Sequence, residues 1–534
     1  MTADLIDAGD GLPLTIPALL HARVAERGDA VLLVADDDRL TYADAERRSA
    51  ALARGLLAVG AGPGTRVALL HPNDAELVVG WLAAARIGAV SVPLSTFSTS
   101  LELVDLLRRA DVDVLLSAAS FRTNDYVSRL QEGIPELDLE ASGPLLSPTV
   151  PSLRRLAFSA EHDMPGPSCS HHADWTRAGL IDAAKAVDPA VLAALEALVT
   201  PADPMVIVHT SGSTSEPKGV IHTHGALIRH LDNLNQLRRY ETGEILFSNS
   251  PFFWIGGFAY ALLGTLVAGA TLVCSSAPDA AGVLDVIERE RPTMVNGFAA
   301  TVAHLPADPS FAGRDLSSIR RGNLWPIMPA AVVPADVELR HSMLGMTEAG
   351  SVCLASGDET DQPEHRRGSF GRAVPGFETS VRDDELWFRG PFLMEGYDGR
   401  ERADTFDADG WYCTGDRVRQ DEDGFFYFSG RSSDLIKTAG ANVSAREVEA
   451  AILEVSGLVA HVVGVDDPTN DQIVAALVRS PADHPVDVDD LTAQLRGRLS
   501  AYKVPKRILV APAEDVPMMS SGKLDLRALK ELFA

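Results

Sequence analysis

The sequence predicts an α/β fold for most of the chain and a smaller α+β domain at its C-terminal end. Strand-like and helix-like segments alternate from residue 41 onward, as they do in proteins with parallel sheets. Between residues 368 and 428 the pattern changes to short strands separated by Gly and Asp turns. Because 534 residues are too many for one hydrophobic core, at least two domains are expected.

The first helix of this alternation is predicted from its cap and its stop. Thr41 can cap a helix whose apolar positions include Leu52 and Leu56, and Gly60 ends it. The pattern then continues with a strand at 66–70, a helix at 75–87, a strand at 89–93, a helix at 101–110 and a strand at 113–116. Repeated βα units of this kind predict a parallel sheet.

Residues 132–175 interrupt the alternation. They are rich in Pro, Ser, His and Asp and have no sustained periodicity, so we expect a surface excursion. His171 and His172 in this segment are adjacent rather than one helical turn apart, which favours a solvated pair over a metal site. The βα pattern resumes later with a strand at 270–274, a helix at 281–291 and a strand at 293–296.

An apolar segment, residues 253–274, carries no charged side chain and is long enough to cross a bilayer. It contains four glycines and has no cationic flank on either side. It also divides naturally into a helix that ends near Gly269 and a strand at 270–274. We therefore predict that it belongs to the core.

The C-terminal part differs in texture from the rest. Short strands at 385–388 and 425–428 predict a β-rich subdomain, and residues 430–434 resemble a junction. Beyond it, Ser444 and Glu447 form a capping box that opens a helix, followed by strands near 459–465 and 473–478, a helix near 491–502 and a final helix. We expect an N-terminal domain of residues 1–430 and a C-terminal domain of residues 431–534.

Composition excludes several classes of protein. The chain has 47 basic and 74 acidic residues, and the net charge of −27 opposes binding to nucleic acid or to an anionic membrane. Its four cysteines are far apart and form no C-x-x-C pair, so neither a zinc site nor a disulfide framework is indicated. The first residues lack the features of a secretory signal, and a cytoplasmic location is expected.

A phosphate-binding loop is the main functional signal. The strand-like run 206–210 leads into residues 211–219, which combine glycines, hydroxyls and Lys218. Backbone N–H groups, hydroxyls and one ammonium suit phosphate oxygens. The order of residues is not that of a Walker A loop, because the lysine follows a proline and precedes a glycine. An ordinary Ser/Gly surface loop is the alternative interpretation.

Five segments in order, within 210–219, 344–348, 411–416, 430–440 and 517–523, resemble the adenylate-forming superfamily. That superfamily includes acyl- and aryl-CoA ligases, luciferases and the adenylation domains of peptide synthetases. The resemblance covers nearly the whole chain. It implies two α/β sheets and a small β-barrel in the N-terminal domain, a mobile C-terminal domain, and a reaction through an acyl-adenylate with ATP, Mg²⁺ and coenzyme A.

The resemblance also implies roles for particular residues. Thr347 would meet the α-phosphate, Glu348 would bind Mg²⁺, Asp416 and Arg431 would bind the ribose, Lys523 would serve adenylation, and Lys437 would serve thioester formation after rotation about Ser433. The remaining predicted contacts to ATP are Thr210, Ser211, Gly212, Ser213, Thr214, Lys218, Gly322, Leu344, Gly345 and Met346.

Four positions depart from the pattern of the superfamily. Ser215 replaces a glycine, Leu344 replaces an aromatic residue that stacks on adenine, and Ser433 replaces an acidic or basic hinge residue. The glycine-rich strand end that contacts adenine is recognisable only by Gly322. None of these departures removes a phosphate ligand or a catalytic lysine.

The predicted acyl pocket is bounded by residues 252–258, 296–300 and 344–350. Its residues include Phe253, Trp254, Gly256, Gly257 and Phe298. Members of the superfamily that activate amino acids carry an aspartate in the segment that here is 250–257, where it pairs with the α-ammonium of the substrate. This chain has no aspartate there, so the resemblance implies an acid without an ammonium group, and the apolar and aromatic side chains favour a fatty, alicyclic or aryl acid. Trp254 as a plain core residue is the other interpretation.

Three hypotheses for function follow. The first is an AMP-forming acyl-CoA synthetase. The second is an adenylating enzyme that delivers the acyl group to a carrier-protein phosphopantetheine or to an amine. The third is an inactive paralogue that binds a nucleotide or an acyl group, against which the retained lysines and acids argue. A homodimer is compatible with the sequence.

Overall fold

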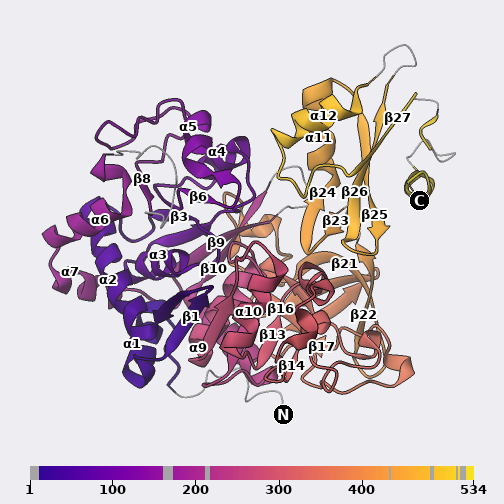
Figure 1. Cartoon of the computed structure of the whole chain (residues 1–534), viewed down its shortest axis with the longest axis horizontal. Coiled ribbons are helices and arrows are strands. Elements are labelled where there is room, and N and C mark those ends of the chain that lie inside the picture. The colour runs from indigo at the N-terminus through magenta and orange to yellow at the C-terminus, as the bar shows by residue number, and fades with distance from the viewer. Residues whose placement is uncertain are drawn as a thin grey trace. The chain divides into compact units, whose positions relative to one another are not determined.

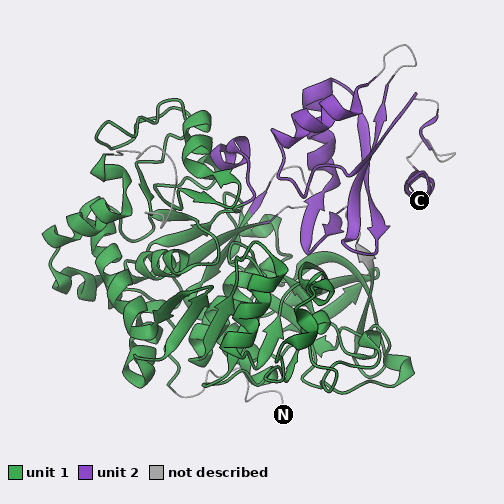
Figure 2. Cartoon of the chain, viewed as in Figure 1, with its two compact units in different colours: residues 1–96, 107–209, 219–430 green, residues 97–106, 210–218, 431–534 purple. Residues whose placement is uncertain are grey.

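The computed structural model describes residues 11–159, 172–210, 217–431, 435–480, 486–512, 515–517 and 525–533 (Figure 1). The chain forms two compact units (Figure 2). Unit 1 comprises Met1–Thr96, Leu107–His209 and Gly219–Gly430, and unit 2 comprises Phe97–Leu106, Thr210–Lys218 and Arg431–Ala534. This grouping does not test the predicted division at residue 430, because segments from both sides of it join unit 2.

One α/β sheet of unit 1 has six strands within the described residues and is parallel except at one edge. Its order is β14 (Arg321–Gly322), β13 (Met294–Asn296), β11 (Ile245–Ser248), β12 (Thr271–Cys274), β1 (Val31–Ala35) and β2 (Asp38–Thr41). β2 is antiparallel to β1, to which a short turn joins it. The predicted strands at 270–274 and 293–296 are β12 and β13.

A second sheet has seven strands in the described part of the chain. Its order is β20 (Gly396–Tyr397), β10 (Lys218–Thr223), β9 (Pro204–Thr210), β4 (Val90–Pro93), β3 (Arg66–Leu70), β5 (Val114–Ser117) and β8 (Arg155–Phe158). The strands β4, β3, β5 and β8 are mutually parallel, as the βα pattern predicts. β20 is antiparallel to β10, so two segments far apart in the sequence meet at this edge.

The prediction of a surface excursion at 132–175 is wrong in one respect. β8 lies inside this segment and adds a parallel edge strand beside β5. A strand of four residues inside a Pro- and Ser-rich segment is too short to show a period. His171 lies outside the described residues, whereas His172 accepts a hydrogen bond from the backbone N–H of Asp174 at 3.3 Å.

The helices of unit 1 begin at caps that the sequence supplies. The Thr41 hydroxyl accepts from the N–H of Asp44 at 3.0 Å and starts α2 (Tyr42–Ala58). Asp74 caps α3 (Ala75–Arg86) in the same way at 2.7 Å. The other helices that contribute to unit 1 are α1 (Ile16–Arg27), α4 (Ser100–Arg109, shared with unit 2), α5 (Tyr126–Gly133), α6 (Arg177–Ala183), α7 (Pro189–Glu196), α8 (His224–Leu237) and α10 (Ala280–Glu290).

The apolar segment 253–274 belongs to the core, as predicted. It forms a π-helical stretch, η3 (Gly256–Leu263), continues as α9 (Gly264–Ala268) and ends at Gly269, which has a φ of 66°. β12 follows, and most residues of the segment are buried. No helix in the described part of the chain is long and apolar enough to cross a membrane.

The β-rich region contains two antiparallel sheets within the described residues, in the place where the small barrel was expected. Three strands form one sheet: β15 (Leu344–Met346), β16 (Ser351–Ala355) and β17 (Arg372–Ala373). Four strands form the other: β18 (Glu378–Arg382), β19 (Glu385–Arg389), β21 (Tyr412–Gln420) and β22 (Phe426–Arg431). A single bridge pairs Ser369 with Tyr427, beside the second sheet.

Unit 2 is an α+β body with five described strands in its sheet. Its elements are β23 (Leu435–Thr438), β24 (Ala441–Ser444), α11 (Ala445–Ser456), β25 (Ala460–Asp467), β26 (Asp471–Arg479), α12 (Val488–Arg496), β27 (Arg507–Ala511) and α13 (Leu526–Glu531). Ser444 caps α11, as predicted. The predicted helix at 491–502 ends at Arg496, because Gly497 follows it.

A buried lysine ties three parts of unit 2 together. The Lys503 ammonium lies 2.7 Å from a carboxylate oxygen of Glu447 and 2.7 Å from one of Glu102. Glu102 comes from the Phe97–Leu106 segment of this unit. Burial lowers the pKa of Lys503, but Tyr502 and the two carboxylates together raise it above its usual value, so the ammonium stays charged. Such a triad is stable only while both acids remain in place.

Candidate active site

The predicted phosphate loop lies between two strands that are neighbours in the seven-stranded sheet. β9 ends at Thr210 and β10 begins at Lys218. Ser211, Gly212, Ser213 and Thr214 lie outside the described residues. A loop at the end of a parallel strand is a common place for a ligand site in α/β proteins.

A short turn after β15 carries Thr347 and Glu348. The backbone carbonyl of Thr347 accepts a hydrogen bond from His222 Nε2 at 2.6 Å, and that of Glu348 accepts from the N–H of Met394 at 2.9 Å. Burial lowers the pKa of His222 to about 4, so its ring is neutral and carries the proton on Nε2. The turn is therefore fixed from two sides.

Gly350 closes this turn in a left-handed conformation with a φ of 71°. A Cβ atom at this position would lie 2.7 Å from Leu227 Cδ2. The backbone conformation favours glycine here, and a larger residue would also displace the Leu227 side chain. The turn that follows Met346 therefore has one backbone path, which sets where Thr347 and Glu348 lie.

The Glu348 carboxylate is held by a pair of tyrosines. The Tyr397 hydroxyl donates to Glu348 Oε1 at 2.8 Å, and it lies 3.1 Å from the Tyr412 hydroxyl, from which it can accept. Burial and the neighbouring Glu348 raise the pKa of Tyr397 well above its usual value. Tyr397 thus remains a donor at neutral pH and orients the carboxylate.

The site fits a cation that is bound mainly through phosphate. Mg²⁺ is usually bound by one or two carboxylates together with substrate phosphate oxygens. The described residues contain no group of three side chains that could hold a metal by themselves. Glu348, half-buried and oriented by Tyr397, supplies one carboxylate of the required kind.

Asp416 lies at a bulge in β21. Glu385 pairs with Arg417 while Trp387 pairs with Cys413, so β21 has extra residues between these positions. Gly415 in the bulge has a φ of 69°, and the Thr414 hydroxyl accepts from the Asp416 N–H at 2.9 Å. Bulges of this kind redirect a side chain. The Asp416 carboxylate is buried, with the residue 1% exposed.

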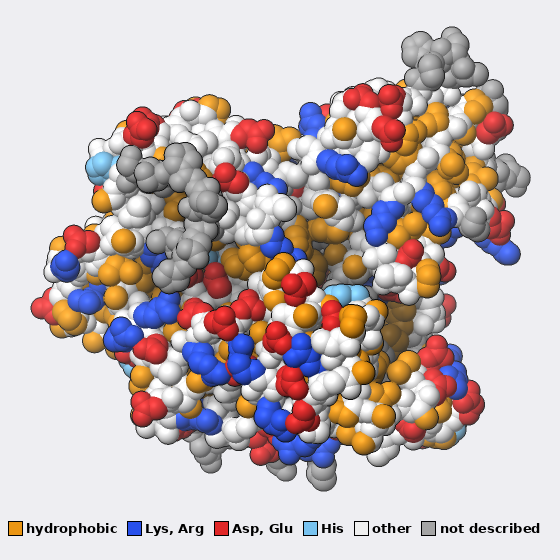
Figure 3. Space-filling view, in the orientation of Figure 1, with side chains coloured by type: hydrophobic (Ala, Val, Ile, Leu, Met, Phe, Trp, Pro, Cys, Tyr) orange, Lys and Arg blue, Asp and Glu red, His pale blue; other side chains and the backbone are white. Residues whose placement is uncertain are grey.

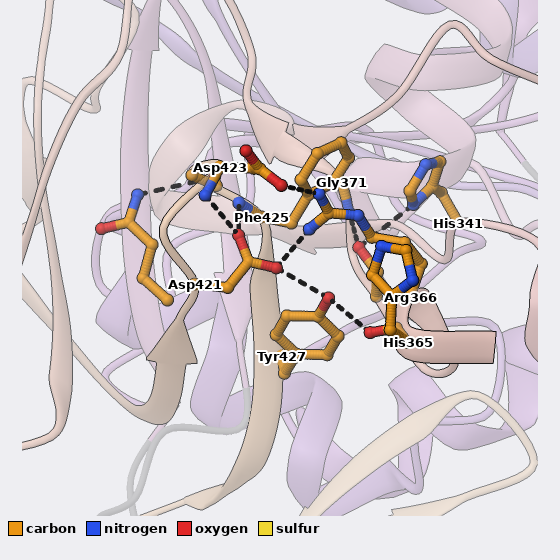
Figure 4. Close-up of polar contacts among 11 residues, drawn as sticks. His341, His365, Arg366, Gly371, Asp421, Asp423, Phe425 and Tyr427 are labelled. Atoms are coloured by element: carbon orange, nitrogen blue, oxygen red, sulfur yellow. Dashed lines mark hydrogen bonds and ion pairs between the residues drawn. The ribbon is translucent and has the colours of Figure 1, made fainter. Parts of the chain in front are cut away.

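The far end of the β21–β22 hairpin is clamped by a polar cluster (Figure 4). Arg366 forms ion pairs with Asp421 and Asp423, and its guanidinium lies over the Phe425 ring, 4.0 Å from the centroid. The Tyr427 hydroxyl donates to Asp421 at 2.9 Å. This cluster fixes the turn of the hairpin whose strands carry Asp416 and end at Arg431.

Near the predicted acyl pocket, two asparagines hold the backbone after β13. Asn323 Oδ1 accepts from the N–H of Gly297 at 3.1 Å, and Asn323 Nδ2 donates to the carbonyl of Gly297 at 2.9 Å. Asn249 makes the same pair of bonds with Phe298, at 3.2 and 3.3 Å. Neither asparagine belongs to a motif, so the sequence did not indicate them.

Gly297 is required by this arrangement. Its φ is 154°, and a Cβ atom there would lie 2.0 Å from Asn249 Oδ1. Gly322 is constrained in the same way, with a φ of 134° and the Val295 carbonyl oxygen 1.9 Å from the position of a Cβ. Gly322 therefore lets the neighbouring strand β13 approach closely, and Gly297 leaves room for the Asn249 amide.

Aromatic rings of the predicted acyl pocket lie together. The Trp254 and Phe298 rings meet edge to face with centroids 5.8 Å apart, and Phe253 lies 5.2 Å from Trp254. A Cβ at Gly256 would point into open space, whereas one at Gly257 would lie 2.0 Å from the Pro251 carbonyl oxygen. A larger side chain therefore has room at Gly256, whereas at Gly257 it would collide with the backbone of Pro251.

A sequence profile described as AMP-binding enzyme matches residues 20–398, and one described as AMP-binding enzyme C-terminal domain matches residues 447–523. The first match alone covers well over half of the chain. The chain belongs to the AMP-binding enzyme family. Within that family it is of the acyl-CoA ligase type of the adenylate-forming superfamily.

Relatives of this AMP-binding enzyme cover nearly its full length. A feruloyl-CoA synthase from an Amycolatopsis species is 32% identical over 91% of this chain and 92% of the relative. A mitochondrial medium-chain acyl-CoA ligase from Mus musculus is 28% identical over 94% of this chain and 84% of the relative. The structure of an amide bond synthetase, McbA from Marinactinospora thermotolerans, has a TM-score of 0.74 and 25% identity, over 96% of this chain and 99% of McbA.

Several predicted residues of this AMP-binding enzyme are described apart from the sites above. Leu344 and Met346 are buried in β15, whereas Gly345 between them is exposed. Lys437 is exposed on β23 of unit 2. Lys523 and the hinge residue Ser433 lie outside the described residues, so their roles stay predictions.

On the face in Figure 3, basic side chains lie among acidic ones and form no extended basic patch.

Sequence reasoning missed the residues that position the site of this enzyme. Tyr397 and His222 hold the Thr347–Glu348 turn, and Arg366 clamps the hairpin of Asp416. Each of them acts on a segment far away in the chain, so no local spacing reveals the contact. The edge pairing of β10 with β20 brings His222 and Tyr397 to the same turn.

Proposed function

We propose that this enzyme activates an apolar carboxylic acid with ATP as an acyl-adenylate and then transfers the acyl group to the thiol of coenzyme A. The observation that carries the proposal is the Glu348 carboxylate, which Tyr397 orients at 2.8 Å on the turn that also holds Thr347. Family membership as an acyl-CoA ligase supports the use of ATP and coenzyme A.

In the first half-reaction a carboxylate oxygen of the acid attacks the α-phosphorus of ATP, and pyrophosphate leaves. Negative charge collects on the phosphate oxygens, and fixed donors and cations lower its energy. Ser211, Thr214 and Lys218 would bind the β- and γ-phosphates. Thr347 would bind the α-phosphate. Mg²⁺ bound at Glu348 would supply further neutralisation of phosphate charge.

Residues 416 and 431 would hold the sugar of ATP. The buried Asp416 carboxylate can accept hydrogen bonds from ribose hydroxyls. Arg431 is the last residue of β22, the strand that pairs with the strand of Asp416. A ribose held at both hydroxyls fixes the α-phosphate against the attacking acid. The bulge at Gly415 and the polar cluster at Arg366 would thus orient the residues that bind the ribose, and would take no part in the chemical steps.

The acid itself is expected to be fatty, alicyclic or aryl. Trp254, Phe253 and Phe298 offer aromatic surface, and residues 250–257 contain no acidic side chain that could pair with an ammonium. The feruloyl-CoA synthase and the medium-chain ligase, as named, act on an aryl and an aliphatic acid. Both kinds of acid are apolar apart from a few oxygen atoms.

An acceptor other than coenzyme A is the second candidate function. The amide bond synthetase McbA shares the fold over nearly the whole chain. An amine or a carrier-protein thiol could attack the same acyl-adenylate, because the first half-reaction does not involve the acceptor.

The proposed location is the cytoplasm, with which the free thiols of Cys274, Cys353 and Cys413 are consistent.

The test is a panel of carboxylic acids assayed for pyrophosphate release with and without coenzyme A. The proposal expects acid-dependent release, AMP rather than ADP as the nucleotide product, and an acyl-CoA product. Release of ADP and phosphate would overturn the adenylation mechanism. Acyl-adenylate that forms but transfers only to an amine or a carrier protein would favour the second candidate.

Two lysine variants test the division of the half-reactions. Lys523→Ala is expected to abolish acyl-adenylate formation while sparing thioester formation from pre-made acyl-adenylate. Lys437→Ala is expected to do the reverse, because the C-terminal domain would present one lysine at a time. Loss of the same half-reaction in both variants would contradict domain alternation about Ser433.

A further inference from the structure

A buried amide at the end of β13 has one polar atom that nothing described in the chain satisfies. Asn296 is 7% exposed, and its Nδ2 donates to Asn323 Oδ1 at 3.3 Å. Its Oδ1 is buried and has no hydrogen-bond partner among the described residues. Buried polar atoms are normally paired, so an acceptor without a donor calls for an explanation.

The orientation of this amide is fixed by its neighbours. Asn323 makes two bonds to the backbone of Gly297, and these bonds determine which atom of Asn323 is the oxygen. That oxygen faces Asn296, which must therefore present its NH₂ group toward it. Turning the Asn296 amide over would bring two carbonyl oxygens together. The atom left without a partner is therefore an acceptor and not a donor.

Strand geometry shows which way the Asn296 side chain points. Alternate residues of a strand face opposite sides of the sheet, so Asn296 shares a face with Met294, while Val295 faces the other way. Met294 packs in the core cluster that contains Phe258 of η3 and Leu344 of β15. Val295 packs in a different cluster, with Leu284 and Ile287 of α10. Asn296 thus faces the layer of η3 and β15, which carries the predicted acyl pocket.

The position of Asn296 within the sheet supports a ligand there. It is the last residue of β13, and β11, β13 and β14 are parallel neighbours. Ligands of open α/β sheets bind beyond the carboxyl ends of such strands. Phe298, two residues further on, packs against Trp254. The acceptor therefore lies two residues before an aromatic contact of the predicted acyl pocket.

We propose that Asn296 Oδ1 accepts a hydrogen bond from a hydroxyl group of the acid, so that the preferred substrate is a hydroxylated apolar acid. This inference rests on the proposed function and narrows its substrate class. A hydroxyl supplies the missing donor without a charge, and residues 250–257 offer no acid that would stabilise an ammonium. An ordered water is the alternative donor, and the experiment below distinguishes the two.

The experiment compares pairs of acids that differ by one hydroxyl. Aryl and fatty acids with the hydroxyl at each available position are assayed against their unsubstituted partners, and kcat/KM is taken from pyrophosphate release. The wild-type enzyme is expected to prefer one hydroxylated acid by about tenfold or more, because a site built around a buried polar group discriminates strongly against an analogue that leaves it unpaired.

Variants assign the preference to this residue. Asn296→Leu is expected to lower the ratio of kcat/KM values for the hydroxylated and the unsubstituted acid to near one. Asn296→Ala removes atoms only and gives the same readout if leucine is not accommodated. Phe298→Leu is the matched control in the same pocket, and it is expected to lower kcat/KM for both acids and leave their ratio unchanged.

The outcomes separate this inference from the proposed function. Pyrophosphate release with any acid supports the proposed function, whichever way the ratios turn out. A wild-type ratio near one for every hydroxyl position, or the same preference in Asn296→Leu, would overturn the role of Asn296 and leave a water as its partner. No release with any acid would overturn both proposals.

Discussion

The proposed ATP side and the proposed acyl side of this enzyme are both held by side chains from other parts of the chain, but the groups that hold them differ. On the ATP side, a neutral imidazole and a tyrosine hold the Thr347–Glu348 turn. On the acyl side, the amides of Asn249 and Asn323 hold residues 297 and 298 by paired backbone bonds. The first arrangement orients a carboxylate for charge, and the second shapes a pocket. Variants on the two sides should therefore fail in different ways.

The largest effect is expected on the ATP side. Glu348→Gln removes the charge that would bind Mg²⁺ and should lower pyrophosphate release by about 100-fold or more, as loss of a preorganised electrostatic contact typically does. The loss should be the same for every acid. Glu359→Gln, an exposed position paired with Arg239, is the control. If the loss of pyrophosphate release differs from one acid to another, the two sides do not act separately.

The next effect is expected on the acyl side. Gly297→Val places atoms where Asn249 Oδ1 now lies, and the loop has to move. The strain should weaken acid binding by about tenfold to a hundredfold, which corresponds to the few kcal/mol typical of a forced backbone conformation. The KM for the acid should rise and the KM for ATP should stay. Gly62→Val, where a Cβ meets nothing within 4 Å, is the matched control.

A smaller effect is expected at Tyr397. Tyr397→Phe keeps the ring and removes the hydroxyl that orients Glu348, so activity should fall by about tenfold, in line with one hydrogen bond to a charged group. The concentration of Mg²⁺ that gives half-maximal stabilisation of the enzyme with a non-hydrolysable ATP analogue should rise. Tyr260→Phe, whose hydroxyl contacts only Met343 sulfur among the described residues, should change neither quantity. An unchanged Mg²⁺ dependence in Tyr397→Phe would contradict its positioning role.

The smallest effect is expected on the stability of the fold alone, at His230 of α8. His230 stacks on Phe392, and burial lowers its pKa to about 3. The folded state keeps this ring neutral while the unfolded chain binds a proton below about pH 6.5. Its contribution is therefore present above pH 6.5 and lost as the pH falls toward 3, by at most about 1.4 kcal/mol per pH unit.

His230→Phe tests this pH dependence. The variant should show a shallower fall of Tm between pH 7 and pH 5, because the ring can no longer take up a proton. His21 should affect stability with the opposite pH dependence. Its hydrogen bond to Glu196 raises its pKa, so its contribution to stability is lost as the pH rises. His21→Gln should therefore lose stability mainly at low pH. Equal slopes in wild type and His230→Phe would contradict the assignment.

The comparison also shows what sequence could predict. β3 has the predicted bounds, and the Thr41 cap and the stop at Gly269 are where local patterns place them. These features depend on neighbours in sequence. β8 was missed because four residues in a polar segment show no period. The π-helical form of η3 was not predicted, because an apolar segment without charged residues has no polar face that would show the period of the helix.

The same distinction holds within the candidate site. Glu348 and Asp416 were predicted as site residues because each lies in a short motif. Tyr397, Asn249 and Asn323 were not, because their contacts join segments that only the sheets bring together. Motifs therefore indicate which atoms would touch the substrate, and the fold indicates what holds those atoms in place.

The triad at Lys503 has a consequence for how this enzyme could be recombined with its relatives. Glu102 and Lys503 are 401 residues apart in the chain, yet both belong to unit 2. A chimaera that exchanges only residues 431–534 would bury Lys503 beside whatever side chain the host supplies at position 102. The natural module for exchange is discontinuous, and residues 97–106 have to travel with the C-terminal segment.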